Sequence, residues 1–291
     1  MKGPSARPPV HGNPTRRAGA GRLVTLILTA FAALAGGTPL TAQEDFRHLD
    51  DGRPTRVEDA YPLKFLEWEW QLGAGGSLEE GERYEAETVL ELKMGAVPNT
   101  QIGVEAHMGW AQALGSSATG VESFSFHTLY NLNQEGRRSP AVALRTDLFL
   151  PGVGDLAHQE PGGRLRAMAT RSFGTTRVHG NVAREWRGTV DEGNRWSAGI
   201  GFDRALGFSS RAIVGSVYAE SFDVGGPVRV WVDGGIRLQI SKQSVLDAGV
   251  SLRMDEWVDG AQNVGVVIGL SRAFGFSGLA RVPPYPDPAI R

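Results

Sequence analysis

Cysteine is absent from the chain, which excludes disulfide bonds, thiol chemistry, cysteine metal sites and a lipid-anchored cysteine. After the first 42 residues, no apolar run reaches the roughly 18 residues that indicate a membrane-spanning helix, and helical periodicity is missing. The six histidines show no metal-ligand spacing, and the Gly-x-Gly pieces lie within expected strands rather than before helices. We therefore predict no metal, cofactor or nucleotide site, and we expect any membrane-spanning part to consist of strands.

The first 42 residues have the pattern of a cleaved secretory signal peptide. Basic residues precede an apolar run over residues 23–34, and small residues end at Ala42, after which we expect cleavage. An uncleaved anchor is the alternative, although this run is shorter than the roughly 20 residues of a spanning helix. The pair Arg16 and Arg17 is compatible with twin-arginine export. Secretion without cysteine fits the periplasm or the outer membrane of a diderm bacterium.

Acidic residues outnumber basic ones once this leader is removed. It holds five of the 30 basic residues and no acidic one, so about 25 remain against 32 acidic residues, a net charge near −7. Such a charge argues against a nucleic-acid partner.

Apolar and polar residues alternate along most of the remaining chain, most clearly over residues 228–240. Apolar residues or glycine occupy the even positions there, whereas Asp233 and Arg237 are among the odd ones. Strand side chains point alternately to two faces, so one face suits lipid and the other suits water. The same pattern predicts strands at 66–74, 84–96, 100–111, 121–132, 141–150, 164–173, 177–187, 195–204, 211–221, 228–241, 244–254 and 263–274.

We therefore predict an all-β fold, an antiparallel up-and-down transmembrane β-barrel of about 12 strands over residues 66–274. The rival is a periplasmic β-sandwich, whose strands centre on five or six residues, whereas spanning strands need about nine to eleven. Short turns near Pro98, Gly174, Gly207 and Lys242 alternate with longer connections, as periplasmic turns alternate with outer loops. The connection over 133–140 is the weakest fit. We expect residues 43–65 to be a periplasmic lead-in and 275–291 a proline-rich periplasmic tail.

Charges of both signs fall on the polar face of the expected strands. A basic residue facing the bilayer midplane costs about 2–4 kcal/mol, so we expect these side chains to line the lumen. They either border a conducting passage, in which early acidic residues face Arg145 and Arg237 and orient a polar solute, or form a salt-bridge network that fills a narrow barrel. The candidates are Glu67, Glu69, Glu85, Glu87, Glu91, Lys93, Glu105, His107, Arg145, Asp147, His179, Asp233 and Arg237.

Large aromatic residues on the strands are candidates for interfacial girdles at headgroup level, with the core packing of a soluble sandwich as the alternative. These candidates are Trp68, Trp70, Trp110, Tyr130, Trp186 and Trp196.

A serine and a histidine on one strand suggest a different function, that of an outer-membrane hydrolase. Ser123, Ser125 and His127 share one strand face. Outer-membrane phospholipases instead use the order His-x-Ser with an orienting asparagine, which cannot be identified here. We therefore predict that the protein is not an enzyme.

Several segments resemble the family of bacterial outer-membrane, transporter-like proteins named for the MetA pathway of phenol degradation. The similar segments are 53–60, 140–145, 148–152, 170–174, 178–181, 235–238 and 245–249. The resemblance implies an outer-membrane barrel that passes small compounds, aromatic ones among them, and it defines no site. The chain departs from the usual barrel ending because residues 275–291 follow the last expected strand.

The sequence thus predicts an outer-membrane channel that passes small aromatic or polar solutes through a charge-lined lumen. Its expected partners are outer-membrane lipid, the barrel-assembly machinery and a small-molecule solute, while the oligomeric state stays open. The alternative is a non-conducting structural or adhesive barrel with a filled lumen.

Overall fold

A computed structural model describes residues 46–79, 83–113, 116–188, 194–207, 210–254 and 263–275. The expected signal peptide, and all but the first residue of the expected carboxy-terminal tail, lie outside this part of the chain. No helix in the described part is long and apolar enough to cross a membrane.

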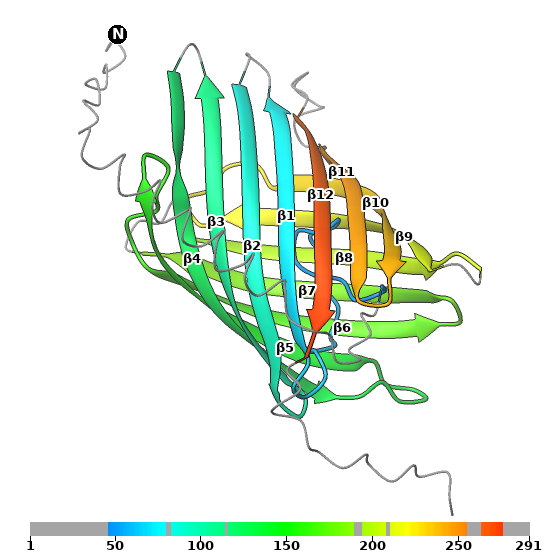
Figure 1. Cartoon of the computed structure of the whole chain (residues 1–291). Helices are drawn as coiled ribbons and strands as arrows, with labels where there is room; N and C mark the ends of the chain where they lie inside the picture. Colours follow the sequence, from blue (N-terminus) through cyan, green and yellow to red (C-terminus); the bar gives the residue numbers. More distant parts are fainter. Residues whose placement is uncertain are drawn as a thin grey trace, which may run out of the picture. The chain divides into compact units, whose positions relative to one another are not determined.

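Twelve antiparallel strands form a closed barrel, in which each strand pairs with its neighbours in sequence and β1 pairs with β12 (Figure 1). This confirms the predicted fold class and excludes the β-sandwich. The strands are β1 Trp68–Glu79, β2 Arg83–Val97, β3 Thr100–Ala113, β4 Ser116–Asn133, β5 Ala141–Gly154, β6 Gly162–Phe173, β7 Thr176–Arg187, β8 Arg195–Ala205, β9 Arg211–Phe222, β10 Arg229–Ser241, β11 Ser244–Arg253 and β12 Asn263–Phe274.

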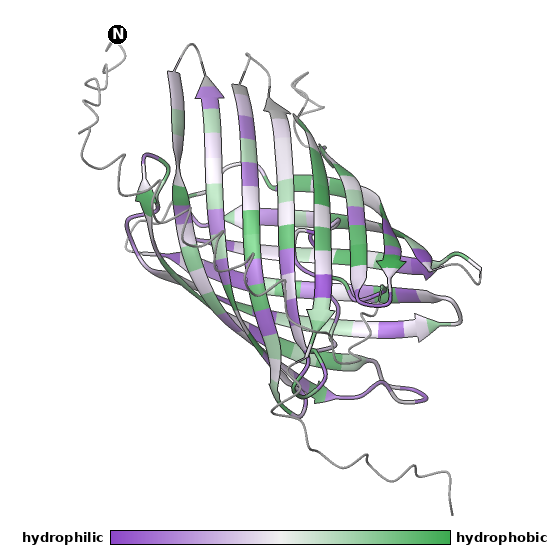
Figure 2. Cartoon of the chain, in the orientation of Figure 1, coloured by the Kyte–Doolittle hydropathy of each residue, from purple (hydrophilic) through white to green (hydrophobic). Residues whose placement is uncertain are grey.

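The alternation in the sequence separates the outer face of the wall from its inner face. In β10, Val232 and Ile236 are 38% and 44% exposed, whereas Asp233 and Arg237 are 3% and 0% exposed. Apolar and polar residues alternate along the strands in Figure 2. The outer face is therefore apolar, and the inner face carries the charges.

The two ends of the barrel differ in their connections. At one end, which we call the turn rim, short turns join β2 to β3, β6 to β7 and β10 to β11. Asn99, in the first of these turns, has the positive φ of 63° that asparagine tolerates well. The opposite end, the loop rim, includes the connection from β5 to β6.

Residues 46–67, which we call the lumen segment, lie inside the barrel over most of their length, and Lys64 and Phe65 near its end are exposed. In Figure 1 this segment is the blue trace between the strands of the near and far walls. Leu49, Val57 and Ala60 are at most 1% exposed. The sequence predicted only a periplasmic lead-in over residues 43–65, because a segment without periodicity carries no sign of insertion.

Candidate functional site: the barrel lumen

The lumen segment begins and ends at the turn rim. Arg47 Nη2 donates to the carbonyl of Thr175, in the turn between β6 and β7, at 3.1 Å. At the other end, the amide of Leu66 donates to the carbonyl of Gly95 at 2.8 Å. Midway, the amide of Asp59 donates to the carbonyl of Leu49, and the amide of Leu49 donates to Asp59 Oδ2 at 3.0 Å. The segment is therefore a re-entrant loop whose two limbs are joined near its middle.

Side chains of the wall satisfy the backbone of the lumen segment. The amide of Glu58 donates to Asn181 Oδ1 and the carbonyl of Glu58 accepts from Asn181 Nδ2, both at 2.8 Å. The amide of Ala60 donates to Thr170 Oγ1 at 3.0 Å, and its carbonyl accepts from Asn131 Nδ2 at 2.8 Å. A buried backbone needs such partners, and side chains of the wall supply them at Glu58 and Ala60. The segment is thus held by wall side chains here and by backbone bonds to Gly95 of β2 at its end.

Glu58 is the centre of a charge cluster in the lumen. Its two carboxylate oxygens each accept at 2.9 Å, one from Arg145 and the other from Arg166. Arg145 also binds Glu105, at 2.6 Å, and Arg166 binds Asp51, at 2.7 Å. The side chains of Glu58, Arg145 and Arg166 are only 2–3% exposed. Each charge therefore has a partner of opposite sign in a place that water barely reaches.

A second cluster holds the tip of the lumen segment. Asp50 forms an ion pair with Lys93, which also contacts Glu69 at 3.1 Å. Arg53 Nη2 lies 3.5 Å from Glu91 Oε2. Further along, Arg56 forms ion pairs and hydrogen bonds with Asp233 of β10.

Glycines of the wall make room for the lumen segment. A Cβ on Gly199 would lie 2.8 Å from a methyl group of Val57, and one on Gly201 would lie 3.2 Å from Val57 Cβ. A Cβ on Gly249 would lie 2.7 Å from Pro54 Cβ. A Cβ on Gly199 or Gly249 would therefore force its neighbour to move, and one on Gly201 would require a small shift, so the wall of β8 and β11 is shaped to the segment.

His48 is an acid-base group of the lumen segment. Its Nδ1 lies 3.3 Å from Asp59 Oδ1, and its Nε2 lies 3.6 Å from Asp50 Oδ1. Burial opposes protonation, but the two carboxylates outweigh it and raise the pKa of His48 to about 9. Burial likewise opposes ionisation of Asp59, and His48 and Arg177 together lower its pKa. The pair is therefore ionic at neutral pH.

The predicted lumen residues fall into three groups. Buried inner-wall positions hold Glu69, Glu91, Lys93, Arg145, Asp147, His179, Asp233 and Arg237. Partly exposed positions hold Glu67, Glu105 and His107, and exposed positions hold Glu85 and Glu87.

The two predicted basic partners both form ion pairs in the lumen. Arg145 binds the early acidic residue Glu105, as noted above. Arg237 forms an ion pair with Asp247 of the neighbouring β11, at 2.8 Å.

Sequence reasoning missed several residues that the lumen uses. Arg166 alternates with the apolar Leu165 and Ala167 and lies opposite the candidate Arg145 in the register of β5 and β6. Asp203 follows the apolar Phe202 and accepts from Arg177 at 2.6 Å. The alternation of apolar and polar residues could therefore have found both. No pattern in the sequence marks Asp50, Asp51 or Glu58 as partners of the wall.

A cavity of about 360 Å³ opens on the loop-rim side of the lumen segment. Its charged side chains are unevenly distributed. Strands β2 to β4 contribute only acidic ones among the Asp, Glu, Lys and Arg residues that line it, namely Glu87, Glu91, Glu105 and Glu122. Strands β5 to β9 contribute Arg145, Arg164, Arg187 and Arg195 together with Glu185 and Glu220. We call this cavity the vestibule.

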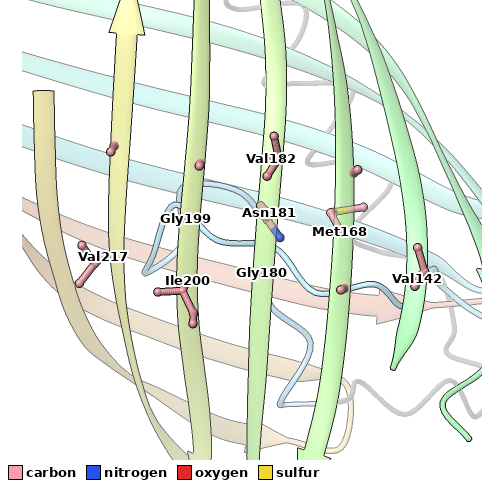
Figure 3. A pocket seen from close by; sticks show the side chains of 12 residues that line it. Val142, Met168, Gly180, Asn181, Val182, Gly199, Ile200 and Val217 are labelled. Carbon is pink, nitrogen blue, oxygen red and sulfur yellow. The ribbon is translucent and has the colours of Figure 1, made fainter. Parts of the chain in front are cut away.

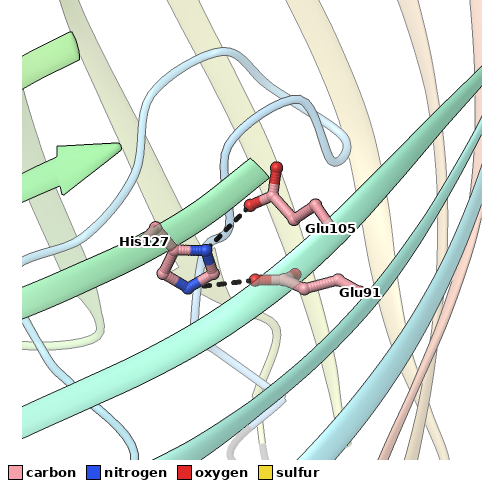
Figure 4. A group of neighbouring side chains, drawn as sticks. All are labelled: Glu91, Glu105 and His127. Atoms are coloured by element: carbon pink, nitrogen blue, oxygen red, sulfur yellow. Dashed lines mark ion pairs between the residues drawn. The ribbon is translucent and has the colours of Figure 1, made fainter. Parts of the chain in front are cut away.

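Three donor side chains lie close enough together to suggest a metal site (Figure 4). In the described part of the chain, Glu91, Glu105 and His127 present donor atoms within 4.8 Å of one another. His127 lies between the carboxylates, with Nδ1 3.1 Å from Glu105 and Nε2 3.4 Å from Glu91. Arg145 and Arg53 already form ion pairs with these carboxylates. The arrangement fits a charge network better than a vacant cation site.

Ser125 of β4 is bonded to a carboxylate rather than to a histidine base. Ser125 Oγ donates to Glu105 Oε2 at 3.0 Å, and neither ring nitrogen of His127 has a hydrogen-bond partner within the described residues. A serine nucleophile needs a base within hydrogen-bond reach. Ser125 is therefore bound to a carboxylate rather than to His127.

The predicted girdle aromatics fall near both rims. Trp68 and Trp70 start β1 and Tyr130 lies near the end of β4, all toward the turn rim. The remaining three, Trp110, Trp186 and Trp196, lie toward the loop rim and are 38–55% exposed. Both sets thus lie near strand ends, where amphipathic rings would meet headgroups.

A hollow of about 640 Å³ lies on the outer face of β5 to β9 (Figure 3). Small residues such as Ala169 and Gly180 form its floor beside the exposed Val182 and Ile200. It contains no charged side chain, in contrast to the vestibule.

Comparisons with known proteins support the fold. No family model matches the chain, and no curated protein matches it. Among solved structures, the COG4313 outer membrane channel from Pseudomonas putida F1 is similar, at 10% identity and a TM-score of 0.57 over 78% of this chain and all (100%) of that one. The KdgM porin covers 70% of this chain and 99% of its own at 10% identity (TM-score 0.46). The NanC porin covers 69% and 98% at 9% identity (TM-score 0.48). The likeness to the COG4313 channel, with a TM-score above 0.5, shows that the chain shares the barrel fold of that outer-membrane protein.

Proposed function

We propose that this protein is an outer-membrane channel for small solutes, and that the lumen segment closes the channel in the conformation described above. The observation that carries the proposal is the nature of the contacts between segment and wall. Beside apolar packing of Val57 and Ala60, these contacts include many ion pairs and side-chain hydrogen bonds, which form and break without disturbing the strand ladder. A passage would open when the segment leaves its place.

The wall supports an outer-membrane location. The strands are 10–18 residues long, which is enough to span a bilayer, and their outer face is apolar. In a diderm bacterium, a barrel of this kind would be exported by its signal peptide and inserted by the barrel-assembly machinery. The turn rim would face the periplasm, as short turns do in such barrels.

The solutes would be small. The polar lumen favours polar compounds, and the resemblance to the MetA phenol-degradation family adds aromatic ones. Both kinds fit the vestibule, whose volume is near the lower end of the roughly 300–1,000 Å³ of small-molecule sites.

The experiment ties the lumen segment to conductance through one reversible bond. Val57→Cys with Gly201→Cys would join segment to wall, since the two Cβ atoms would be 3.2 Å apart. A disulfide needs about 3.5–4.5 Å, so a small shift suffices. The chain has no other cysteine to compete. We expect planar bilayers to show no conductance from the oxidised double variant and restored conductance after reduction.

The single-cysteine variants are the controls, because they should conduct under both redox conditions. Equal conductance of the oxidised and reduced double variant would show that the segment is not the closing element. No conductance from folded wild-type protein or from the reduced variant would refute the channel.

A second function, a structural barrel with a permanently filled lumen, is favoured by the completeness of the ion pairing around Glu58. In that case, reduction of the disulfide would not produce a current.

A further inference from the structure

The vestibule has separated charges that the proposed channel function does not by itself require. Four acidic residues come from consecutive strands β2 to β4, and four arginines come from β5 to β8. On the arginine side, Glu185 pairs with Arg187 and Arg195, and Glu220 of β9 pairs with Arg195, so arginines outnumber carboxylates there by four to two. A channel that selects by net charge would carry one sign around its wall. A cavity with opposite signs on its two sides instead suits a solute that carries both charges.

The basic side is rigidly built around Glu185. The side chain of Glu185 is 5% exposed and accepts from Arg187 Nε at 2.8 Å and from Arg195 Nη2 at 3.1 Å. The Arg187 guanidinium also lies over the ring of Phe149, 4.0 Å from its centroid. These contacts use Nε and one face of Arg187, so its two terminal nitrogens remain available to a carboxylate or phosphate.

The acidic side keeps carboxylates available for a cation. Glu87 contacts His107 Nδ1 at 2.8 Å, and its side chain is 51% exposed. A Cβ on the neighbouring Gly109 would lie 1.9 Å from Glu122 Oε1, so the absence of a side chain there gives that carboxylate its place in the vestibule. No arginine or lysine forms an ion pair with Glu87 or Glu122 within the described part of the chain. A positively charged group would therefore find partners on this side.

We propose that the vestibule binds small zwitterionic solutes of amino-acid type. The ammonium group would lie toward Glu87 and Glu122, the carboxylate toward Arg187 and Arg195, and an apolar body against Phe149. The proposal deepens the channel function above, because it names the class of solute that would pass. A simple anion or a simple cation would satisfy one side of the cavity and be repelled by the other.

The test compares three probes that share one carbon skeleton. L-phenylalanine carries both charges, 3-phenylpropionate only the negative one and phenethylamine only the positive one. Isothermal titration calorimetry of the full-length, detergent-purified protein should show L-phenylalanine binding at least about tenfold more tightly than either analogue, the effect of one ion pair. Equal binding of all three, or no binding of L-phenylalanine, would overturn the inference.

Two variants locate the binding. Arg187→Gln and Glu122→Gln should each weaken L-phenylalanine binding about tenfold. The matched control is Arg184→Gln on the same strand, since Arg184 pairs with Asp223 in the loop after β9 and lies outside the vestibule. Equal effects of Arg187→Gln and Arg184→Gln would refute the proposed site. If a variant fails to fold, the comparison of the three probes on the wild-type protein still tests whether the protein prefers a zwitterion.

Conductance separates this inference from the channel proposal. A protein that conducts but does not prefer L-phenylalanine is a channel without the zwitterion site. A protein that binds L-phenylalanine but never conducts has the site without the channel function.

Discussion

Removing the charge of Glu58 should release the lumen segment while leaving the barrel intact. Glu58→Gln keeps the size of the side chain but takes the negative partner away from Arg145 and Arg166, both 2% exposed. Removal of one partner from a buried ion pair costs about 3–5 kcal/mol. We take the lower end because Arg145 retains Glu105 and Asp147, and Arg166 retains Asp51. About 3 kcal/mol corresponds to roughly a hundredfold rise in the undocked population.

The assay is the reaction of a cysteine hidden by the docked segment. Val57 is 0% exposed, so in Val57→Cys the thiol should react with a water-soluble reagent only when the segment undocks. Under conditions in which docking is fast, the reaction rate follows the undocked population. We expect the rate to rise about a hundredfold when Glu58→Gln is added.

The control removes a carboxylate of similar chemistry from the surface. Asp223→Asn breaks the exposed pair with Arg184 and should leave the reaction rate of Cys at position 57 unchanged. The folded barrel is checked by its migration on gels before and after heating. An unchanged rate in the Glu58→Gln variant, or an equal rise in the Asp223→Asn variant, would show that the Glu58 cluster does not hold the segment.

Three further predictions concern the same segment and the wall around it. Protonated His48 should stabilise the docked segment fully below about pH 6.5, and this contribution should be lost as pH rises through about 9. Conductance should therefore increase between pH 6 and pH 10. The increase should be smaller in the His48→Gln variant. Gly199→Leu should displace Val57 and raise conductance. Gly180→Leu is the control and should leave conductance unchanged, because a Cβ on Gly180 meets nothing within 4 Å. Equal currents from the two variants would count against the fit of segment to wall. Unboiled full-length protein from the membrane fraction should migrate differently from boiled protein, and recovery in the soluble fraction without such a shift would contradict membrane insertion.

The strands could be predicted because a barrel wall between lipid and water imposes one pattern on every strand. The predicted boundaries agree with the observed ones to within about five residues, as for β4, predicted from 121 and observed from Ser116. The first strand begins at Trp68 rather than at Leu66, whose φ of 63° is incompatible with an extended strand. The polar face likewise pointed to the inner wall, where eight of the thirteen lumen candidates are buried.

The lumen segment could not be predicted because its structure depends on distant residues. Glu58 binds Arg145, 87 positions later, and Arg166, 108 positions later. Local periodicity in the sequence carries no information about such contacts, so the sequence of the segment resembles that of any polar connection. The sequence therefore left open whether the charges of the wall line a passage or fill it. Many of the partners of these wall charges lie on the lumen segment, which the sequence did not place inside the barrel.

The polar character of these contacts favours a segment that leaves as well as docks. Burying an ion pair removes two charges from water, and the desolvation cost offsets much of the attraction between them. When the segment leaves, Glu58, Asp50 and Arg53 regain water, and so do their partners on the wall. An apolar plug would instead expose its hydrophobic surface on leaving, at about 25 cal/mol for each Å². A closing element built from charge pairs thus holds a defined position at a smaller net free energy, which is what a channel that must reopen requires.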